Sequence, residues 1–557
     1  SRDQFIAAAG IGQCPDGTQC GRYRFQHPLY HDVLCDEIGD SRRVQLHRRI
    51  ANGSASGDME HTPGIGAEDP RERTVRFDGR TSREAHPGSI AVLPFENRSP
   101  DPDHAFFAAG IHEAILNALG KVRDLQIMAR VSVLRYADGQ TPISQIAADL
   151  NVRAVMEGSV QYADDRVRIT ARLVDADSGA QLWSEIYDRA FRDIFTIETD
   201  IAARIASVFR AEFAPRERET LDEKPTQSSE AYAAYLRAIA VGALAGGLET
   251  TPEQSVGIHR SLDQALSLDP NFALAYALKA REYAYSMARL VHRSDELTVT
   301  VRDELARENA ERALALDASS SLAHAGLAVA HRFAGRDKEA RLAFERALDL
   351  NPSDPRVLRD VAFFHLFRGR YDTALEVARA IVEIDPGLGN FLIGYTLMPM
   401  GDCDDALTAC RKLLSLRPDF SLAHQLHGLI LLAKGDEAKA LESLRLSEEL
   451  GYTASVYAIA QTGFAYQILG HREDAQRIFE NIEALAREYV LTNAAWALAY
   501  LAVGDLGKAL RSLNRAADRG GAGEDISTAT IRFNLLSAPV LEQPEFLQLR
   551  RRLGFTG

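Results

Sequence analysis

The sequence has very little cysteine, and this excludes two classes of protein. Five cysteines in 557 residues cannot form the disulfide framework of a small secreted protein. Cys14, Cys20 and Cys35 have no second pair at metal-ligand spacing. Cys403 and Cys410 lie seven residues apart in a predicted helical repeat, where they fill a helix face. We therefore expect neither a disulfide-bonded fold nor a metal site.

Long apolar runs and basic blocks are also missing. No apolar stretch reaches the ~18 residues that a membrane helix needs, and no signal-peptide pattern occurs. The net charge of −14 repels nucleic acid and anionic membranes. We expect a cytoplasmic protein that binds no nucleic acid and does not insert into a membrane. The sequence begins at Ser1 without a methionine, so we also expect a piece of a longer chain.

Common nucleotide-binding and metal-binding motifs are absent from the sequence. No Gly-x-x-x-x-Gly-Lys-Ser/Thr phosphate loop occurs, because the glycines and the lysine at 504–508 have the wrong spacing. His112 and Glu113 begin like a zinc-protease motif, but Leu116 stands where the second histidine is needed. We predict no catalytic residue, no bound metal and no cofactor.

The C-terminal half does contain an internal repeat. A glycine recurs at intervals of 34, 32, 34, 35 and 34 residues. An alanine follows each glycine by five residues, and a small residue precedes each by seven. A proline follows three of the glycines by seventeen residues. These columns are Gly335, Gly369, Gly401, Gly435, Gly470 and Gly504; Ala340, Ala374, Ala406, Ala440, Ala475 and Ala509; Ala328, Ala362, Gly394, Gly428, Gly463 and Ala497; and Pro352, Pro386 and Pro418.

These columns predict pairs of antiparallel helices. The small residue and the alanine let two helices approach closely, the glycine supplies the positive φ that closes the first helix, and proline ends the second. The pattern resembles the tetratricopeptide repeat. This resemblance implies a right-handed superhelix whose first helices line a concave groove.

Weaker copies precede the six regular ones. Ala280 and Ala306 fit two of the columns but require an insertion near Met287–Thr300, and residues 266–270 look like the end of an earlier copy. We predict about eight repeats over 229–519 and a capping helix within 525–557, where Phe546, Leu547 and Leu553 supply an apolar face.

Residues 88–213 have a different pattern of apolar residues. Short apolar runs at 89–95 and 125–128 predict buried strands, and 101–120, 142–150 and 195–213 predict helices. Runs at 154–162, 166–175 and 180–187 predict an antiparallel meander. In the middle run Val167 and Ile169 alternate with Arg166, Arg168 and Arg172, which indicates one wet face. The expected fold class is an α/β sandwich domain followed by an all-α repeat superhelix.

Four runs in this segment resemble the domain similar to the N-terminal part of the translocation protein TolB. They are Ser89-Ile-Ala-Val-Leu-Pro-Phe95, Phe107-Ala-Ala-Gly-Ile111, Val155-Met-Glu-Gly-Ser-Val160 and Leu182-Trp-Ser-Glu-Ile-Tyr-Asp188. The resemblance implies a bacterial signalling protein, in which this domain stands between an N-terminal effector and tetratricopeptide repeats. Such effectors include class III nucleotide cyclases, protein kinases and winged-helix domains.

Residues 1–50 form a third element. The runs 23–34 and 42–50 predict two amphipathic helices after a small hairpin. They resemble the end of the ATPase module of STAND-type regulators, so we expect a short helical fragment of such a module. Residues 51–87, rich in Gly, Pro, Ser and mixed charge, predict a flexible linker.

The repeat groove is the expected binding site. In tetratricopeptide repeats the second, fifth, ninth and twelfth positions of the first helix face the groove. This resemblance assigns partner-binding roles to a set that mixes arginine with aromatic residues, both common at peptide interfaces. The set is Arg332, Arg356, Arg359, Phe363, Leu388, Phe391, Tyr395, Gln425, Leu429, Phe464 and Gln467.

Two functional hypotheses follow from the sequence. In the first, the chain is a non-enzymatic signalling or scaffolding protein whose repeats bind a protein, a peptide or a second copy of the chain. Its α/β domain then couples to an effector. In the second, it is the regulatory part of a class III adenylate or guanylate cyclase, or of a STAND ATPase regulator, whose catalytic domain lies upstream.

Overall fold

The N-terminal unit, Ser1–Arg83, is described here only in its two strands. β1 (Ile6–Gln13) pairs antiparallel with β2 (Gln19–Phe25). Tyr23–Phe25 therefore belongs to a strand and not to the predicted helix over 23–34. The computed structural model describes residues 6–13, 19–25, 85–101, 104–120, 122, 125–209, 224–244, 250–286, 291–292, 299–352, 354–451, 456–518 and 543–552. The rest of the predicted ATPase fragment and nearly all of the linker lie outside these residues.

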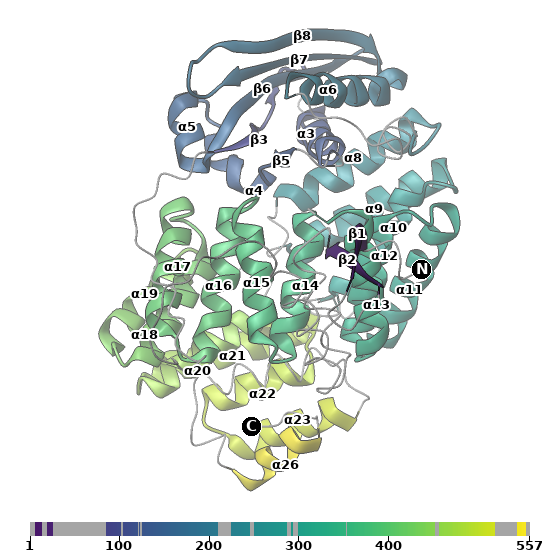
Figure 1. Cartoon of the computed structure of the whole chain (residues 1–557). Helices are drawn as coiled ribbons and strands as arrows, with labels where there is room; N and C mark the ends of the chain where they lie inside the picture. The colour runs from purple at the N-terminus through teal and green to yellow at the C-terminus, as the bar shows by residue number, and fades with distance from the viewer. Residues whose placement is uncertain are drawn as a thin grey trace. The chain divides into compact units, whose positions relative to one another are not determined.

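The second unit, Glu84–Gly557, begins with a mixed sheet (Figure 1). Its strand order is β5-β3-β6-β7-β8, and β4 also pairs with β6. β3 runs parallel to β5 and β6, whereas β6, β7 and β8 form the predicted antiparallel meander. The strands are β3 (His86–Val92), β4 (Glu96–Asn97), β5 (Gln126–Ile127), β6 (Val152–Ala163), β7 (Arg166–Asp175) and β8 (Gln181–Ala190).

Helices cover both faces of this sheet at β3. Since neighbouring side chains of a strand point to opposite faces, Ile90 and Val92 pack beneath α3 (Ala105–Leu119) and α6 (Ile194–Val208). Ala91 and Leu93 pack on the other face with α4 (Arg130–Val133), η3 (Leu134–Tyr136) and α5 (Ile143–Leu150). The fold is the expected α/β sandwich.

The alternation in β7 behaves as predicted. Val167 and Ile169 are buried, while Arg166, Arg168 and Arg172 are exposed. Arg166 pairs with Asp188, and Arg172 pairs with Glu157 on the neighbouring strand. Two of the three arginines are therefore engaged in cross-strand ion pairs on the wet face of the sheet.

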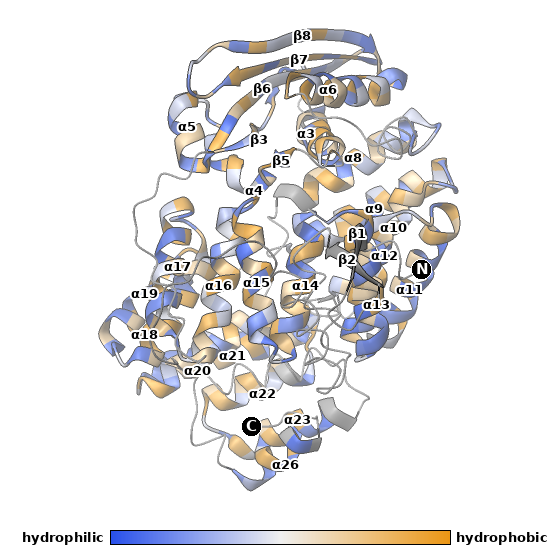
Figure 2. Ribbon diagram, viewed as in Figure 1, coloured by the Kyte–Doolittle hydropathy of each residue, from blue (hydrophilic) through white to orange (hydrophobic). Residues whose placement is uncertain are grey.

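Helix pairs make up the remainder of this unit (Figure 1). The described residues contain eight pairs, whose helices carry apolar stripes beside hydrophilic ones (Figure 2). The pairs are α8/α9 (Ser229–Leu244, Pro252–Leu268), α10/α11 (Ala273–Ser286, Val299–Leu316), α12/α13 (Ser321–Phe333, Asp337–Leu350), α14/α15 (Pro355–Phe367, Tyr371–Val382), α16/α17 (Pro386–Met400, Cys403–Leu416), α18/α19 (Ser421–Lys434, Glu437–Glu449), α20/α21 (Val456–Ile468, Arg472–Glu488) and α22/α23 (Asn493–Ala502, Leu506–Asp518).

The repeat columns have the predicted geometry. All six glycines have positive φ, between 71 and 86°. The alanines five residues later are buried. A Cβ atom at Gly428 would lie 3.1 Å from the carbonyl oxygen of Ala440, and one at Gly394 would lie 3.4 Å from that of Ala406. The small residue and the alanine thus meet across each of these two pairs.

Two details differ from the simple repeat. Pro386 begins α16, because α15 has already ended at Val382, so this proline starts a helix as well as separating two. Within the predicted insertion, β9 (Val291–His292) pairs antiparallel with β10 (Tyr489–Val490), and α11 then begins at Val299. The insertion therefore connects the second helix pair with the segment after α21.

A last helix, α26 (Pro544–Arg552), contacts α23 and buries Phe546 and Leu549. Leu547 is largely exposed, and Leu553 lies outside the described residues. No helix in the described part of the chain is both long and apolar enough to cross a membrane.

Candidate functional site

The sheet domain and the repeats contact each other directly. α3 packs on α8 so closely that a Cβ atom at Gly110 would lie 2.8 Å from Cβ of Leu236. The backbone N–H of Ala129 donates to the carbonyl oxygen of Ile384 over 2.7 Å. Ser132 Oγ donates to Asp385 Oδ1 over 3.0 Å. The first helices of the repeats therefore face the sheet domain at two places.

Between these contacts lies a cavity of about 430 Å³, which we call the junction cavity. The sheet domain contributes α3 and residues 125–130 to its wall. The repeats contribute α8, α9, α10, α14, α16 and the turn from α17 to α18. Apolar side chains in the wall include Leu116, Ile127, Leu278, Leu388 and Phe391.

Four of the eleven predicted groove residues line this cavity together. Arg356 and Arg359 come from α14, and Leu388 and Phe391 come from α16. α14 and α16 are the first helices of consecutive pairs, and these four of their residues line one cavity. Arg356 and Leu388 are half-buried, whereas Arg359 and Phe391 are buried.

The other seven residues lie outside the cavity wall. Arg332 is buried with its guanidinium over the rings of Phe333 and Phe367. Gln425 Nε2 donates to the carbonyl oxygen of Ala458 and to Thr462 Oγ1, so its amide links α18 to α20. Neighbouring first helices approach closely there, so these side chains are buried between them. Tyr395, Leu429 and Phe464 are also buried, while Phe363 and Gln467 are half-buried.

Arg356 joins the repeats to the sheet domain. Its guanidinium donates to both carboxylate oxygens of Asp354, the N-cap residue of α14, over 3.0 and 2.8 Å. It also donates to Asn117 Oδ1 over 3.0 Å and lies 3.7 Å from Glu113. Burial alone would raise the pKa of Asp354, but Arg356 lowers it to about 2. Both groups of this pair are therefore charged at neutral pH.

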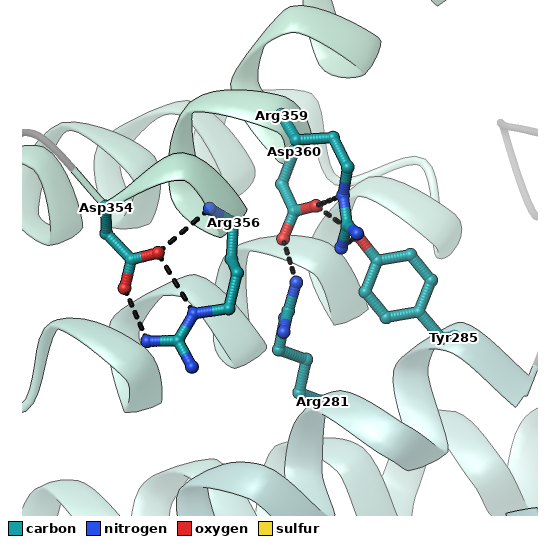
Figure 3. Close-up of polar contacts among 6 residues, drawn as sticks. All are labelled: Arg281, Tyr285, Asp354, Arg356, Arg359 and Asp360. Carbon is teal, nitrogen blue, oxygen red and sulfur yellow. Dashed lines mark hydrogen bonds and ion pairs between the residues drawn. The ribbon is translucent and has the colours of Figure 1, made fainter. Parts of the chain in front are cut away.

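A second ionic group lies beside the first, as Figure 3 shows. Asp360 is fully buried on α14 and accepts hydrogen bonds from Arg359 Nε over 3.1 Å and from the hydroxyl of Tyr285. Arg281 Nη2 lies 3.4 Å from its other oxygen. Burial would raise the pKa of Asp360, but Arg281 and Arg359 hold it below its ordinary value. We call Arg281, Tyr285, Arg359 and Asp360 the arginine cluster.

No sequence motif singles out Arg281, Tyr285 or Asp360. Arg281 and Tyr285 are four residues apart and share a face of α10. This spacing is the pattern in the sequence that could have pointed to them. Their meeting with Asp360, more than seventy residues away, depends on how the helix pairs stack.

His112 lies in the interior of the sheet domain and is held there by two polar contacts. It is fully buried, its Nε2 lies 2.9 Å from the carbonyl oxygen of Val92, and Nη1 of Arg130 lies 3.1 Å from its Nδ1. Burial, with the nearby Arg130, lowers the pKa of His112 to about 3, so the ring is neutral. It links α3 to β3 and α4. Among the described residues no group of three or more His, Cys, Asp or Glu side chains could hold a metal ion.

Comparison with known proteins identifies the helical repeats. The tetratricopeptide repeat family model matches residues 304–355, 339–388 and 391–451. A curated protein named "Putative adenylate cyclase 3", from Rhizobium meliloti (strain 1021), is 32% identical over 249 residues. The match covers 44% of this chain and spans only 38% of the relative's length.

Two solved structures are similar to part of this chain. Pseudomonas aeruginosa pilF is 20% identical, with 38% of this chain and 93% of that protein covered and a TM-score of 0.29. YrrB, described as a tetratricopeptide-repeat protein with an unusual peptide-binding site, is 21% identical, with 34% and 92% covered and a TM-score of 0.25. Such low scores carry no argument about function, so the repeat assignment depends on the family match and on the helix pairs themselves.

Proposed function

Because the chain carries tetratricopeptide repeats, we propose that it is the partner-binding, non-catalytic part of a bacterial signalling protein in the cytoplasm. The repeats bind a segment of a protein partner. The sheet domain, which resembles the TolB N-terminal domain, passes the bound state to an effector. The contacts of α8, α14 and α16 with the sheet domain support this coupling, since they join the partner-binding array to the domain beside it.

The half-buried groove residues are the proposed partner contacts. They are Arg356, Phe363, Leu388 and Gln467, whose side chains keep accessible surface on the first helices. Phe363 carries the proposal, because its ring stacks on Phe367 with centroids 5.4 Å apart and planes 11° from parallel. A held aromatic ring with one accessible side is a typical anchor at protein interfaces.

A peptide-display selection against the purified chain tests this assignment. We expect selected peptides to bind Phe363→Ala at least tenfold more weakly than the parent, because the anchor ring is lost. Leu342→Ala is the matched control, since Leu342 is half exposed on α13, the second helix of its pair. Equal binding by parent and Phe363→Ala, with unchanged helicity, would refute the groove assignment. Self-association that Phe363→Ala abolishes would identify a second copy as the partner.

A second candidate function is regulation of a nucleotide cyclase encoded in the same polypeptide. The 32% identity to the Rhizobium protein favours it, although the aligned part covers less than half of either chain. A STAND ATPase regulator is the other enzyme-linked form of this hypothesis. An assay of the purified chain with ATP and Mg²⁺ or Mn²⁺ separates the hypotheses: we expect no cyclic AMP and no ATP hydrolysis, and turnover would assign the chemistry to this chain itself.

A further inference from the structure

The junction cavity has the size and the walls of a small-molecule site. Its volume of about 430 Å³ lies within the ~300–1,000 Å³ that is usual for such sites. Leu116 and Ile127 of the sheet domain line it together with Leu278, Leu388 and Phe391 of the repeats. The apolar part of a ligand bound here would have its surface buried by the sheet domain on one side and by the repeats on the other.

Arg281 in the wall has a donor without an acceptor. It is only 8% exposed and lines the cavity, yet among the described residues its Nε has no hydrogen-bond partner, as is also true of Arg130 Nε. Among the described residues the one carboxylate contact of Arg281, to Asp360, is long at 3.4 Å. A guanidinium has five N–H donors, and a buried donor without an acceptor destabilises the folded state. Arg281 is therefore poised to gain hydrogen bonds from an anion that enters the cavity.

Asp360 is already shared among three donors. It already accepts from Arg359 Nε and from the hydroxyl of Tyr285, so one carboxylate serves two guanidinium groups. Arg359 Nη2 in turn donates to the oxygen of Tyr285 over 3.0 Å. Figure 3 shows Arg281 rising from α10 toward this group, with the Asp354–Arg356 pair on its other side. The arginine cluster thus carries one positive charge more than its carboxylate balances.

We propose that the junction cavity binds a small organic monocarboxylate with an apolar body, whose carboxylate pairs with Arg281. A dianion such as a phosphate ester fits less well, because the wall holds four carboxylates, of Glu113, Glu282, Asp354 and Asp385, beside five arginines, and one added negative charge already balances them. Asp354 and Glu113 face Arg356, and Asp385 accepts from the N–H of Leu388 and from Ser132. Arg281 and Arg130, whose buried Nε atoms have no hydrogen-bond partner among the described residues, remain as the groups with donors to spare, and Arg281 lies on the repeat side.

This site goes beyond partner binding and does not depend on it. Since its walls come from both the sheet domain and the repeats, a bound carboxylate would favour the state in which the two are joined. The ligand would then act as a signal that the sheet domain and the repeats detect together.

Calorimetric titration of the full chain with 4-phenylbutyrate tests the proposal, with 4-phenylbutanol as the uncharged match. We expect the acid to bind at least tenfold more tightly than the alcohol. Arg281→Met should remove that difference, because methionine is unbranched and has a helix propensity close to that of arginine but has no donor. Arg477→Met is the control, since Arg477 pairs with Glu448 and Asp474 on an exposed surface away from the cavity.

A second variant keeps the proposal testable if Arg281→Met does not fold. Leu388→Trp fills the cavity from its apolar wall, and we expect it to abolish binding of 4-phenylbutyrate without lowering the melting temperature. Equal affinity for acid and alcohol would overturn the proposal. So would unchanged acid binding by a folded Arg281→Met or Leu388→Trp variant, or a parent chain that does not bind the acid in the millimolar range.

Discussion

Replacing Asp360 with asparagine is expected to destabilise the repeat array by about 3–5 kcal/mol, the usual cost of removing one partner from a buried ion pair. Asp360 is fully buried, and its carboxylate is the charged acceptor for both Arg281 and Arg359. Asparagine keeps the shape but replaces the carboxylate shared by two buried guanidinium groups with a neutral amide. The cost is therefore one of unpaired charge and not of lost volume.

Urea unfolding followed by circular dichroism measures this loss, and hydrogen exchange shows where it falls. We expect faster exchange in α10 and α14, the helices that the arginine cluster joins. Repeat arrays unfold in parts, so the local measurement guards against a misleading global fit. Asp337→Asn is the control, because Asp337 is half exposed in its pair with Arg368 and should cost less than about 1 kcal/mol.

The same variant should change the pH dependence of stability. Since the folded pKa of Asp360 lies below its ordinary value, its contribution is fully present above about pH 4 and is lost as the pH falls through the folded pKa. The parent should lose this stability on acidification, and Asp360→Asn should not. A variant as stable as the parent at pH 7, with the same acid profile, would show that the cluster contributes nothing to stability.

Gly428→Leu is expected to cost about 3 kcal/mol, because it overfills the contact between α18 and α19. Even a Cβ atom at Gly428 would lie 2.8 Å from Cγ of Leu444 and 3.1 Å from the carbonyl oxygen of Ala440. Both of these neighbours are fully buried, so neither can move aside cheaply. The two helices would have to move apart, whereas a small residue at this position lets them pack closely.

Gly257→Leu is the matched control for this change. Gly257 lies within α9, has an ordinary helical φ and would have no neighbour within 4 Å of a Cβ atom. Leucine there should raise the free energy of unfolding by up to about 1 kcal/mol, because its helix propensity exceeds that of glycine. Urea unfolding of the two variants should move in opposite directions. A shift of the same size and sign in both would mean that glycine at 428 matters for propensity and not for packing.

The features that sequence could predict are those set by short-range geometry. The positive φ of the six column glycines, the contact of Gly428 with Ala440 and the alternation in β7 each involve residues close in the chain or on one strand. The α/β sandwich and the helix pairs followed from them. The prediction of a helix from residue 23 was wrong, because Tyr23–Phe25 belongs to strand β2. The run from 23 to 34 has an amphipathic pattern that also fits a helix.

The candidate site could be predicted only in part, because its parts meet over long distances. Placing Arg356, Arg359, Leu388 and Phe391 on one surface required only the repeat register. Bringing Arg356 to Asn117 joins residues 239 apart, and it depends on how the sheet domain packs on the repeats. The burial of Gln425 between α18 and α20 depends on the spacing of neighbouring first helices, which no single repeat specifies.

Photo-crosslinking in the source cells tests most directly whether the groove side of the repeats holds a protein. A photoreactive amino acid replaces Phe363 in one version of the chain and Leu342 in the other, so that each reports on a different helix of a repeat pair. Irradiation should join position 363, and not position 342, to one discrete partner band that mass spectrometry can identify. Crosslinks from 342 alone, or none from 363 while the chain remains folded, would contradict a groove-bound partner.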